Sequence, residues 1–249
     1  MNNEAFVEKL KTCLERLNLT FNDKQLSLFL AYYKMVIDKN QYMNLTSIVD
    51  EDEFIEKHFE DSLSIILAKI NGKPLAPALF SEKSIIDVGT GAGFPGIPLK
   101  LAFPSIHLTL TDSLNKRILF LQDVVNTLEL KHVTCVHARA EELGHNVNYR
   151  EKYDFVVSRA VANLSVLAEY DLPFVKQGGY FLPYKGESIQ DELNRSKSAI
   201  NTLGGEITDL TSFILPGTDY KRNIVTIHKI NHTPKKYPRK AGTPASNPL

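Results

Sequence analysis

The segment Ser84-Ile-Ile-Asp-Val-Gly-Thr-Gly-Ala-Gly-Phe-Pro-Gly96 decides the fold of this 249-residue chain. It begins with a short β-branched run, residues 84–88, which is typical of a buried strand. Several glycines follow at once, and glycine permits positive φ and lets a ligand approach the main chain closely. A helical pattern comes next, near residues 97–103. A strand, a glycine-rich turn and a helix in this order predict a ligand-binding turn.

The glycine turn has two interpretations. Gly91, Gly93 and Gly96 fit the GxGxxG pattern of NAD-dependent oxidoreductases, which point a helix N-terminus at a pyrophosphate. Asp87, however, stands two residues before the first glycine, Gly89. A carboxylate there suits the amino group of S-adenosylmethionine better than a diphosphate, and the proline of the turn removes an amide donor that a phosphate would use. The turn therefore favours S-adenosylmethionine as the cofactor, with NAD as the alternative.

A second acid supports this interpretation. Asp112 ends the next predicted strand, residues 107–111, where a carboxylate can accept hydrogen bonds from both hydroxyls of a ribose. Ser113 follows it and is expected to cap a helix over residues 114–128. The spacing between glycine turn and acid is that of a nucleoside-binding unit.

The chain divides into four segments. Residues 1–70 show helical periodicity, residues 71–83 read as a linker, and residues 231–249 form a basic tail. Between them, residues 84–230 alternate strands and helices, which predicts an α/β fold with a parallel sheet. The expected strands cover residues 84–88, 107–111, 133–137, 153–158, 180–184, 206–215 and 223–230.

The last two strands should pair differently from the others. They are joined by Pro216-Gly217 with no helix between them, so an antiparallel pair is expected at one edge of the sheet. A Rossmann-like parallel sheet that closes with a reversed strand resembles the class I methyltransferases. That resemblance covers residues 84–230, and it makes residues 1–70 an N-terminal helical extension.

Net charge hides an uneven distribution. The chain has 29 basic and 29 acidic side chains, and residues 221–249 hold seven basic side chains and no acid. In the tail, Lys235, Lys236, Arg239 and Lys240 surround Tyr237, so phosphate contacts and one base-stacking platform are expected there. A solvated, disordered tail is the alternative, although the tyrosine and the spaced prolines favour a docked segment. An RNA partner is therefore predicted despite the neutral total.

Other classes are excluded by composition. The two cysteines, Cys13 and Cys135, form no CxxC pair, so we expect no disulfide framework and no metal site. Neither a secretory signal nor an apolar run long enough for a membrane span is present. We expect a cytoplasmic protein that binds no membrane and acts as a monomer.

The turn after the fourth strand, residues 158–162, bears on the nucleophile. It lacks the Asn/Asp-Pro-Pro-aromatic sequence of enzymes that methylate exocyclic amines, and no cysteine follows Cys135 to attack a pyrimidine. Guanine N7 fits what remains, because its lone pair carries no proton and needs no general base. Arg159 in this turn is expected to bind the methionine carboxylate or an RNA phosphate, or else to pair with a structural acid.

An apolar pattern from Glu53 to Ile70 predicts another helix, and His58 and Asp61 share one of its faces. A catalytic or RNA-contacting role is conceivable for these two side chains. We expect instead that they join the helical extension to the sheet.

The motifs together resemble the RsmG (GidB) family of bacterial 16S rRNA 7-methylguanosine methyltransferases. The matching segments are residues 44–46, 58–63, 87–98, 112–117, 138–141, 158–161 and 237–244, so the resemblance covers nearly the whole chain. The family usually has proline where Ala241 stands here, which leaves the assignment intact. The resemblance implies methylation of guanine N7 in the 530 loop of 16S rRNA. It leaves open whether naked rRNA or a ribosomal particle is the substrate, and which residues grip the guanine.

The resemblance also implies which residues contact the cofactor. These are Gly89, Phe94, Asp112, Ser113, Leu114, Ala140, Glu141 and Arg159, to which the glycine turn itself adds Asp87, Gly91 and Gly93. Ala140 and Glu141 occupy the turn after the third strand, which in class I methyltransferases lies near the adenine. A non-catalytic RNA-binding protein with a vestigial cofactor turn is the alternative from another functional class.

Overall fold

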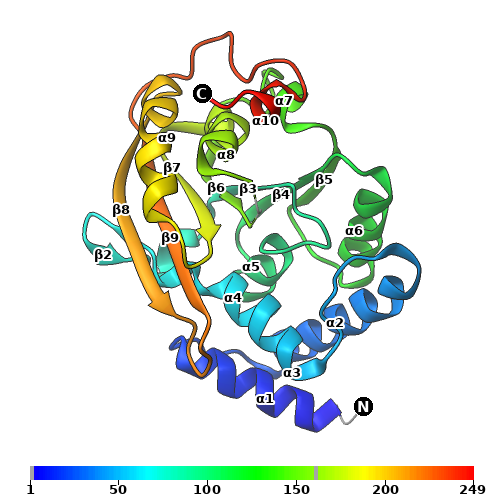
Figure 1. Cartoon of the computed structure of the whole chain (residues 1–249). Coiled ribbons are helices and arrows are strands. Elements are labelled where there is room, and N and C mark those ends of the chain that lie inside the picture. Colours follow the sequence, from blue (N-terminus) through cyan, green and yellow to red (C-terminus); the bar gives the residue numbers. More distant parts are fainter. Residues whose placement is uncertain (1–2, 160–161) are drawn as a thin grey trace.

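The computed structural model describes residues 3–159 and 162–249, and its centre is a seven-stranded sheet (Figure 1). The strand order is β5-β4-β3-β6-β7-β9-β8, and the first five of these strands pair in parallel. The strands are β3 (Ser84–Val88), β4 (His107–Asp112), β5 (Val133–His137), β6 (Tyr153–Ser158), β7 (Val175–Lys185), β8 (Gly205–Ile214) and β9 (Lys221–Lys229). All seven strands expected from the sequence are present.

The antiparallel end of the sheet is confirmed, with one refinement. β9 is antiparallel to both of its neighbours and lies between β7 and β8, so the edge strand is β8. β7 also starts earlier than expected. Val175 pairs with Tyr153, and pairing resumes at Tyr180 after a bulge in which Gly178 has a φ of 81°. Gly178 therefore lies in an irregularity inside the strand.

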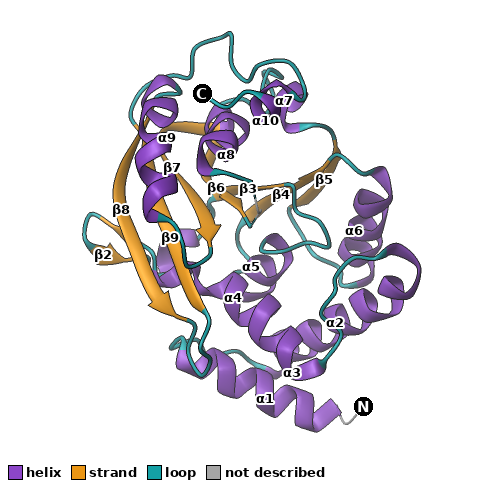
Figure 2. Cartoon of the chain, viewed as in Figure 1, coloured by secondary structure: helices purple, strands orange, loops and turns teal. Residues whose placement is uncertain are grey.

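Helices cover both faces of the sheet (Figure 2). α5 (Gly96–Ala102) and α6 (Asn115–Thr127) pack on one face, and α8 (Leu164–Asp171) and α9 (Gln190–Thr202) on the other. Each face has its own cluster of buried apolar side chains, which gives a three-layer arrangement. Among the described residues, no helix has both the length and the apolar character required to span a membrane.

The N-terminal helices share the core of the first face. α1 (Asn3–Arg16) and α2 (Asp23–Met43) contribute buried side chains to the same apolar cluster as α5 and α6. Asn22 caps α2, because its side chain accepts from Gln25 N and forms a reciprocal capping box. The extension is thus packed against the sheet domain through a continuous core.

The helix expected from Glu53 to Ile70 is more irregular than predicted. A short α3 (Glu51–Phe54) leads into a π-helical turn (Ile55–Glu60), then α4 (Asp61–Leu63) and a 3-10 turn (Ser64–Leu67). The end of the expected helix is instead strand β1 (Lys69–Ile70), which pairs with β2 (Lys73–Pro74). Serine hydroxyls contribute to the irregularity: Ser62 donates to the carbonyl of His58 at 2.5 Å, and Ser64 to that of Asp61 at 2.7 Å.

Residues 71–83 are packed instead of forming a free linker. Leu75 and Phe80 are fully buried, and a 3-10 turn spans Pro77–Phe80. Phe80 stacks on Phe103 with ring centroids 4.9 Å apart. The prolines at 74 and 77 are themselves exposed, and Leu75 and Phe80 anchor the segment to the core.

The C-terminal tail is docked along the second face, as the tyrosine and prolines suggested. Arg150 donates to the carbonyls of Thr233 at 2.7 Å and Tyr237 at 2.9 Å. Arg239 forms an ion pair with Glu169, whose side chain is buried on α8. The segment ends in α10 (Thr243–Ser246), which lies near α7 (Ala140–Leu143) and α8 at the top of Figure 1.

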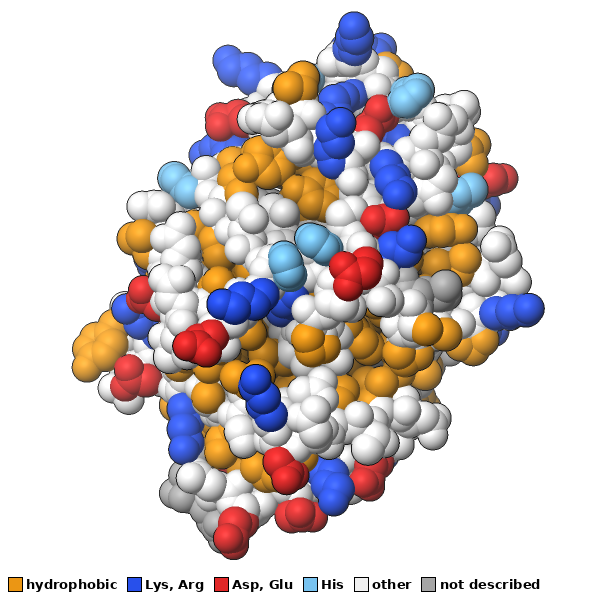
Figure 3. All heavy atoms as spheres, turned by 180° about the vertical axis from the view of Figure 1, so that it is seen from behind, with side chains coloured by type: hydrophobic (Ala, Val, Ile, Leu, Met, Phe, Trp, Pro, Cys, Tyr) orange, Lys and Arg blue, Asp and Glu red, His pale blue; other side chains and the backbone are white. Residues whose placement is uncertain are grey.

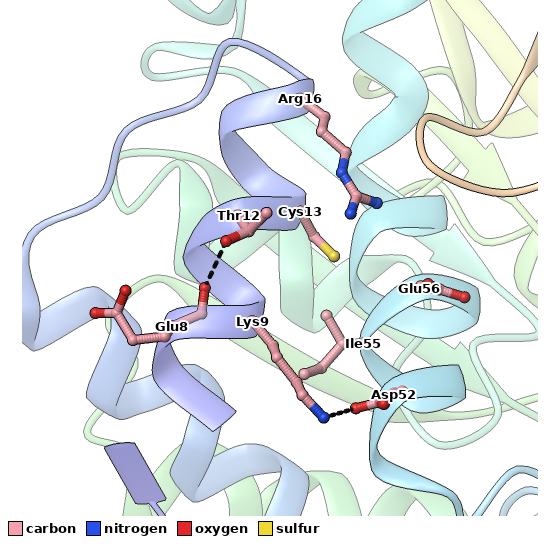
Figure 4. Close-up of a pocket in the computed structure, with 8 residues that line it drawn as sticks. All are labelled: Glu8, Lys9, Thr12, Cys13, Arg16, Asp52, Ile55 and Glu56. Atoms are coloured by element: carbon pink, nitrogen blue, oxygen red, sulfur yellow. Dashed lines mark hydrogen bonds and ion pairs between the residues drawn. The ribbon is translucent and has the colours of Figure 1, made fainter. Parts of the chain in front are cut away.

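One buried acid lies where α1 meets the π-helical turn. Glu60 is fully buried, and neither of its carboxylate oxygens has a hydrogen-bond partner among the described residues. Arg16 reaches from α1 towards this turn beside a pocket of about 300 Å³ (Figure 4), and its Nη1 atom lies 4.0 Å from Glu60 Oε2. Burial raises the pKa of Glu60 to about 7, which outweighs the opposing effect of Arg16.

Stability should therefore depend on pH at this site. The folded state holds the Glu60 proton up to about pH 7, whereas the unfolded value is near 4.5, so stability falls as pH rises through this window. The Glu60→Gln variant lacks the negative charge that wild type acquires at this site above about pH 7. The variant should melt higher than wild type at pH 8, and this advantage should shrink at pH 5. Thermal unfolding at both values checks this, and an advantage independent of pH would contradict it.

Candidate cofactor-binding site

The glycines of the turn after β3 have two different roles. Gly89 and Gly91 adopt φ values of 71° and 62°, and a Cβ atom on either would meet nothing within 4 Å. Gly93 and Gly96 are instead required by packing. A Cβ on Gly93 would lie 2.7 Å from the hydroxyl of Tyr32, and one on Gly96 would lie 2.9 Å from a carboxylate oxygen of Asp87. Only the first two glycines leave room for a ligand beside the backbone.

Asp87 holds the two ends of the turn together through its side chain. Its Oδ2 atom accepts from Thr90 Oγ1 at 2.7 Å and from Gly96 N at 2.8 Å, and its side chain is fully buried. Burial raises its pKa to about 6. Asp87 does not line the adjoining cleft, so the geometry shows a carboxylate that closes the turn and gives no direct support for the expected contact with a ligand amino group.

The turn is also held by the helical extension. Tyr32 of α2 is fully buried and donates its hydroxyl proton to the carbonyl of Ala92 at 2.8 Å. Phe94 packs into a cluster of aromatic rings and stacks on His58, with centroids 4.3 Å apart and planes 5° from parallel. The extension therefore fixes the shape of the glycine turn from the side opposite the cleft.

Asp112 stands at the end of β4, as predicted, with its carboxylate already engaged. Oδ1 accepts from Leu114 N at 2.9 Å, and Oδ2 accepts from Gly91 N at 3.0 Å and from Arg117 at 3.2 Å. The prediction that Ser113 caps the next helix is wrong, since α6 starts at Asn115 and no side chain caps it. The carboxylate of Asp112 takes the Leu114 amide instead. Arg117, which the sequence motif did not single out, neutralises this acid.

A cleft of about 310 Å³ opens beside Asp112. Of the predicted cofactor residues, Gly89, Asp112, Ser113, Ala140 and Glu141 line it, whereas Asp87, Gly91, Gly93, Phe94, Leu114 and Arg159 do not. The lining that sequence reasoning missed consists of Val88, Thr111, Arg117, Ala138, Arg139, Ser158, Ala162, Leu167, Tyr170 and Asp171. Much of this set comes from α8 and neighbouring strand ends, which no glycine motif marks.

The cleft meets the docked tail at Glu141. This side chain is buried at the start of α7, and its Oε1 atom accepts from Gly242 N at 2.9 Å. Nearby, His145 contacts the carbonyl of Pro238 at 2.7 Å. One residue that lines the cleft is thus bonded directly to the main chain of the tail.

Arg159 does not line the cleft and takes part in a network with the helical extension. Its guanidinium donates to the carbonyl of Lys57 at 2.7 Å, to Asp61 Oδ2 at 3.0 Å and to His58 Nδ1 at 3.0 Å. Arg222 of β9 binds the other oxygen of Asp61 at 2.7 Å.

The structure shows Arg159 in an ion pair with Asp61, which is the structural alternative given for it above. His58 and Asp61 do join the extension to the sheet, as expected. Residues 160 and 161 of the same turn lie outside the described residues.

The network also fixes the protonation of His58. An arginine can only donate, so Nδ1 of His58 is an acceptor, and Nε2 carries the proton towards Thr46 Oγ1 at 2.8 Å. Burial, with Arg159 and Lys57 nearby, lowers the pKa of His58 to about 3. This imidazole is neutral and engaged on both sides, so it is not poised to take a proton from a substrate.

Two predicted RNA contacts in the tail require correction. Tyr237 is buried in the core cluster of the second face and is not a base-stacking platform. Arg239 is bound through its guanidinium and its main-chain N–H to Glu169, so its charge is neutralised. Both differ from the prediction because the docked tail turns these two side chains towards the protein, where they pack against the second face and α8. Lys235, Lys236 and Lys240 are exposed and remain predicted RNA contacts.

Comparisons with known proteins agree on a family. The family model described as GidB, rRNA small subunit methyltransferase G, matches residues 25–225. The ribosomal RNA small subunit methyltransferase G of Lachnoclostridium phytofermentans is 45% identical over 248 residues, which cover 100% of this chain and 98% of the relative. That of Acetivibrio thermocellus is 52% identical over 231 residues, with 93% and 91% covered.

Solved structures agree on the fold. A variant of the 16S rRNA (adenine(1408)-N(1))-methyltransferase from Catenulisporales acidiphilia superimposes with a TM-score of 0.51 at 14% identity, covering 64% of this chain and 96% of that one. TYW2 of M. jannaschii, solved in complex with AdoMet, gives 0.50 at 15% identity, with 62% and 73% covered. At these identities the likeness concerns the fold alone.

The parallel sheet with its reversed strand, the glycine turn and Asp112 define a class I S-adenosylmethionine-dependent methyltransferase. The chain belongs to the rRNA small subunit methyltransferase G family. The cofactor is therefore S-adenosylmethionine, and the NAD interpretation of the glycine turn is set aside. The cleft suits this group, because Gly89 leaves its wall open and polar side chains without partners face it.

Asp112 should be the main determinant of cofactor affinity. Asp112→Ala removes the expected ribose acceptor and the bond that holds Gly91, and hydrogen bonds to a charged group contribute about 1.5–3 kcal/mol each. We expect affinity for S-adenosylhomocysteine to fall about 10- to 100-fold by isothermal titration. Asp123→Ala, an exposed change on α6, is the matched control. Unchanged affinity in the Asp112 variant would refute the ribose-binding role.

Proposed function

We propose that this protein transfers the methyl group of S-adenosylmethionine to N7 of a guanine in the 530 loop of 16S rRNA. Membership of the rRNA small subunit methyltransferase G family supports small-subunit rRNA as the substrate. The choice of N7 and of the 530 loop follows the resemblance of the sequence motifs. Two side chains beside the turn after β6, His58 and Asp61, are both fully engaged, and this is the observation that carries the chemistry.

That observation rests on two side chains. Both ring nitrogens of His58 are engaged, and the two carboxylate oxygens of Asp61 are each bound by an arginine. Neither group is free to accept a proton from an incoming base. Such a site suits an acceptor whose lone pair is already exposed, as N7 of guanine is. An exocyclic amine would have to lose a proton during transfer, and these residues offer no place for it.

The chemistry then reduces to placement. When bound, S-adenosylmethionine supplies an activated methyl group on a positively charged sulfur. The residues of the chain hold the reactants so that the N7 lone pair, the methyl carbon and the sulfur come into line. Gly89 and Asp112, which line the cleft, are proposed to hold the cofactor in this alignment. No step is assigned to a side-chain base.

RNA would be held mainly by charge. Lys235, Lys236 and Lys240 are exposed on the docked tail, and Arg139 is exposed at the cleft. On the face shown in Figure 3, basic side chains are frequent towards the upper end and acidic ones gather at the lower end. The upper end is where the tail lies, so the cofactor cleft opens beside the more basic part of the molecule.

The proposed reaction is tested by mapping modified nucleotides. Small-subunit rRNA from cells with and without the gene is compared by N7-methylguanine-dependent strand cleavage at single-nucleotide resolution. One methylated guanine in the 530 loop should disappear with the gene and return with the wild-type chain. Full modification without the gene would contradict the proposal and favour a non-catalytic RNA-binding role. Purified protein incubated with naked rRNA and with small subunits shows which form is methylated.

The exposed lysines should determine the salt dependence of RNA binding. Changing Lys235, Lys236 and Lys240 to Gln removes up to three charges that can bind phosphates. The slope of log K against log salt should flatten by roughly 0.7–0.9 for each phosphate that the variant no longer neutralises. Filter binding of rRNA at several salt concentrations measures this.

A control variant separates position from total charge. Lys11, Lys24 and Lys73 are exposed on other parts of the chain, and changing them to Gln alters the net charge equally. This variant should keep the wild-type slope. Equal slopes for wild type and the tail variant would show that the tail does not contact RNA.

A further inference from the structure

The floor of the cofactor cleft contains an acid without any partner. Asp171, the last residue of α8, is fully buried, and neither of its carboxylate oxygens has a hydrogen bond among the described residues. Thr111 of β4 also lines the cleft, is 1% exposed and leaves its hydroxyl without a partner. Buried polar groups in folded proteins are nearly always bonded, so two orphans in one cleft need an explanation.

Their positions place them around one space. Val88 and Thr111 are direct partners in the β3–β4 register, so their side chains lie on the same face of the sheet, the face that α8 covers. Leu167 lies one helical turn before Asp171 and lines the same cleft. The cleft therefore extends from the glycine turn into the layer between the sheet and α8, and Asp171 stands at that inner end.

The environment of Asp171 favours the uncharged form of its carboxyl group. Burial raises its pKa well above the ordinary value, and the nearby carboxylate of Asp87 adds to the effect. None of the ion pairs among the described residues involves Asp171. A neutral carboxyl group has one O–H donor and one carbonyl acceptor side by side, whereas an ionised one can only accept.

Retaining such a group costs stability. An unsatisfied buried polar group destabilises the folded state, and Leu167 and Val88, which line the same cleft, would accommodate an apolar side chain. A ligand that supplies the missing partners removes this cost when it binds. The donor and acceptor of a neutral carboxyl match a ligand edge that carries an amino group next to a ring nitrogen, which is the edge of adenine.

We propose that Asp171 recognises the adenine edge of S-adenosylmethionine, with its carbonyl accepting from the 6-amino group and its O–H donating to a ring nitrogen. This inference rests on the cofactor already assigned. Glu141, the acid that the family resemblance places near the adenine, has one oxygen occupied by Gly242 of the tail. Asp171 supplies a second polar contact from the opposite side of the cleft, on α8.

Two ligands test the proposal with the full-length chain. One is S-adenosylhomocysteine, and the other is its 6-deamino analogue, in which hydrogen replaces the exocyclic amino group. Wild type should bind the first about 5- to 13-fold more tightly by isothermal titration, since one buried hydrogen bond contributes about 1–1.5 kcal/mol. In Asp171→Leu this preference should fall to about twofold or less.

Two further variants separate recognition from damage to the fold. Asp171→Asn keeps one donor and one acceptor, so it should retain the preference of wild type. Asp123→Leu, on the exposed surface of α6, should also retain it. Without ligand, Asp171→Leu should melt at or above the wild-type temperature, because it removes an unpaired buried group. A lower melting temperature together with an unchanged preference would show that Asp171 is structural.

The outcomes distinguish the proposal from the cofactor assignment. If wild type binds neither ligand, the assignment of S-adenosylmethionine falls, and the role of Asp171 falls with it. If wild type binds both and Asp171→Leu keeps the full preference for the amino compound, only the role of Asp171 is overturned. Loss of the preference in the Leu variant and its retention in the Asn variant support the proposal.

Discussion

The carboxylate of Asp61 holds three parts of the molecule together. Its two oxygens bind Arg159, from the turn after β6, and Arg222, from the reversed strand β9. The acid itself belongs to the helical extension, so one buried group ties that extension to two strands of the sheet. Removing one partner of a buried ion pair costs about 3–5 kcal/mol, because the remaining charges lose their compensation. Here two guanidinium groups would be left without their shared anion.

The same junction shapes the glycine turn. Arg159 positions His58, and His58 stacks on Phe94 within the turn. Tyr32 binds the carbonyl of Ala92, two residues before Phe94. Phe94 and Arg159 therefore link the glycine turn and the turn after β6 to the extension, and their contacts with the cofactor stay a prediction. The helical extension therefore holds the glycine turn in place through Tyr32 and His58.

Local patterns in the sequence were enough to predict the strands, the glycine turn and Asp112. β-branched runs, glycine spacing and an acid at a strand end depend on neighbours along the chain. Contacts between distant segments could not be predicted in this way. Tyr237 lies in a basic stretch that looks solvated, and its burial depends on Arg150 and α8. Asp171 gave no signal either, since an acid at a helix end is ordinarily exposed.

The attachment of the tail has a consequence for the lifetime of the protein. The tail lies far along the chain from α7 and α8, yet it supplies the guanidinium that neutralises buried Glu169 and the amide that binds Glu141. A chain shortened by proteolysis or early termination would leave a buried anion uncompensated on α8 and would leave Glu141, which lines the cleft, without its bond to Gly242. Such a fragment would lose stability along with its basic surface, so truncated chains should be cleared by proteases instead of persisting as inactive competitors on RNA.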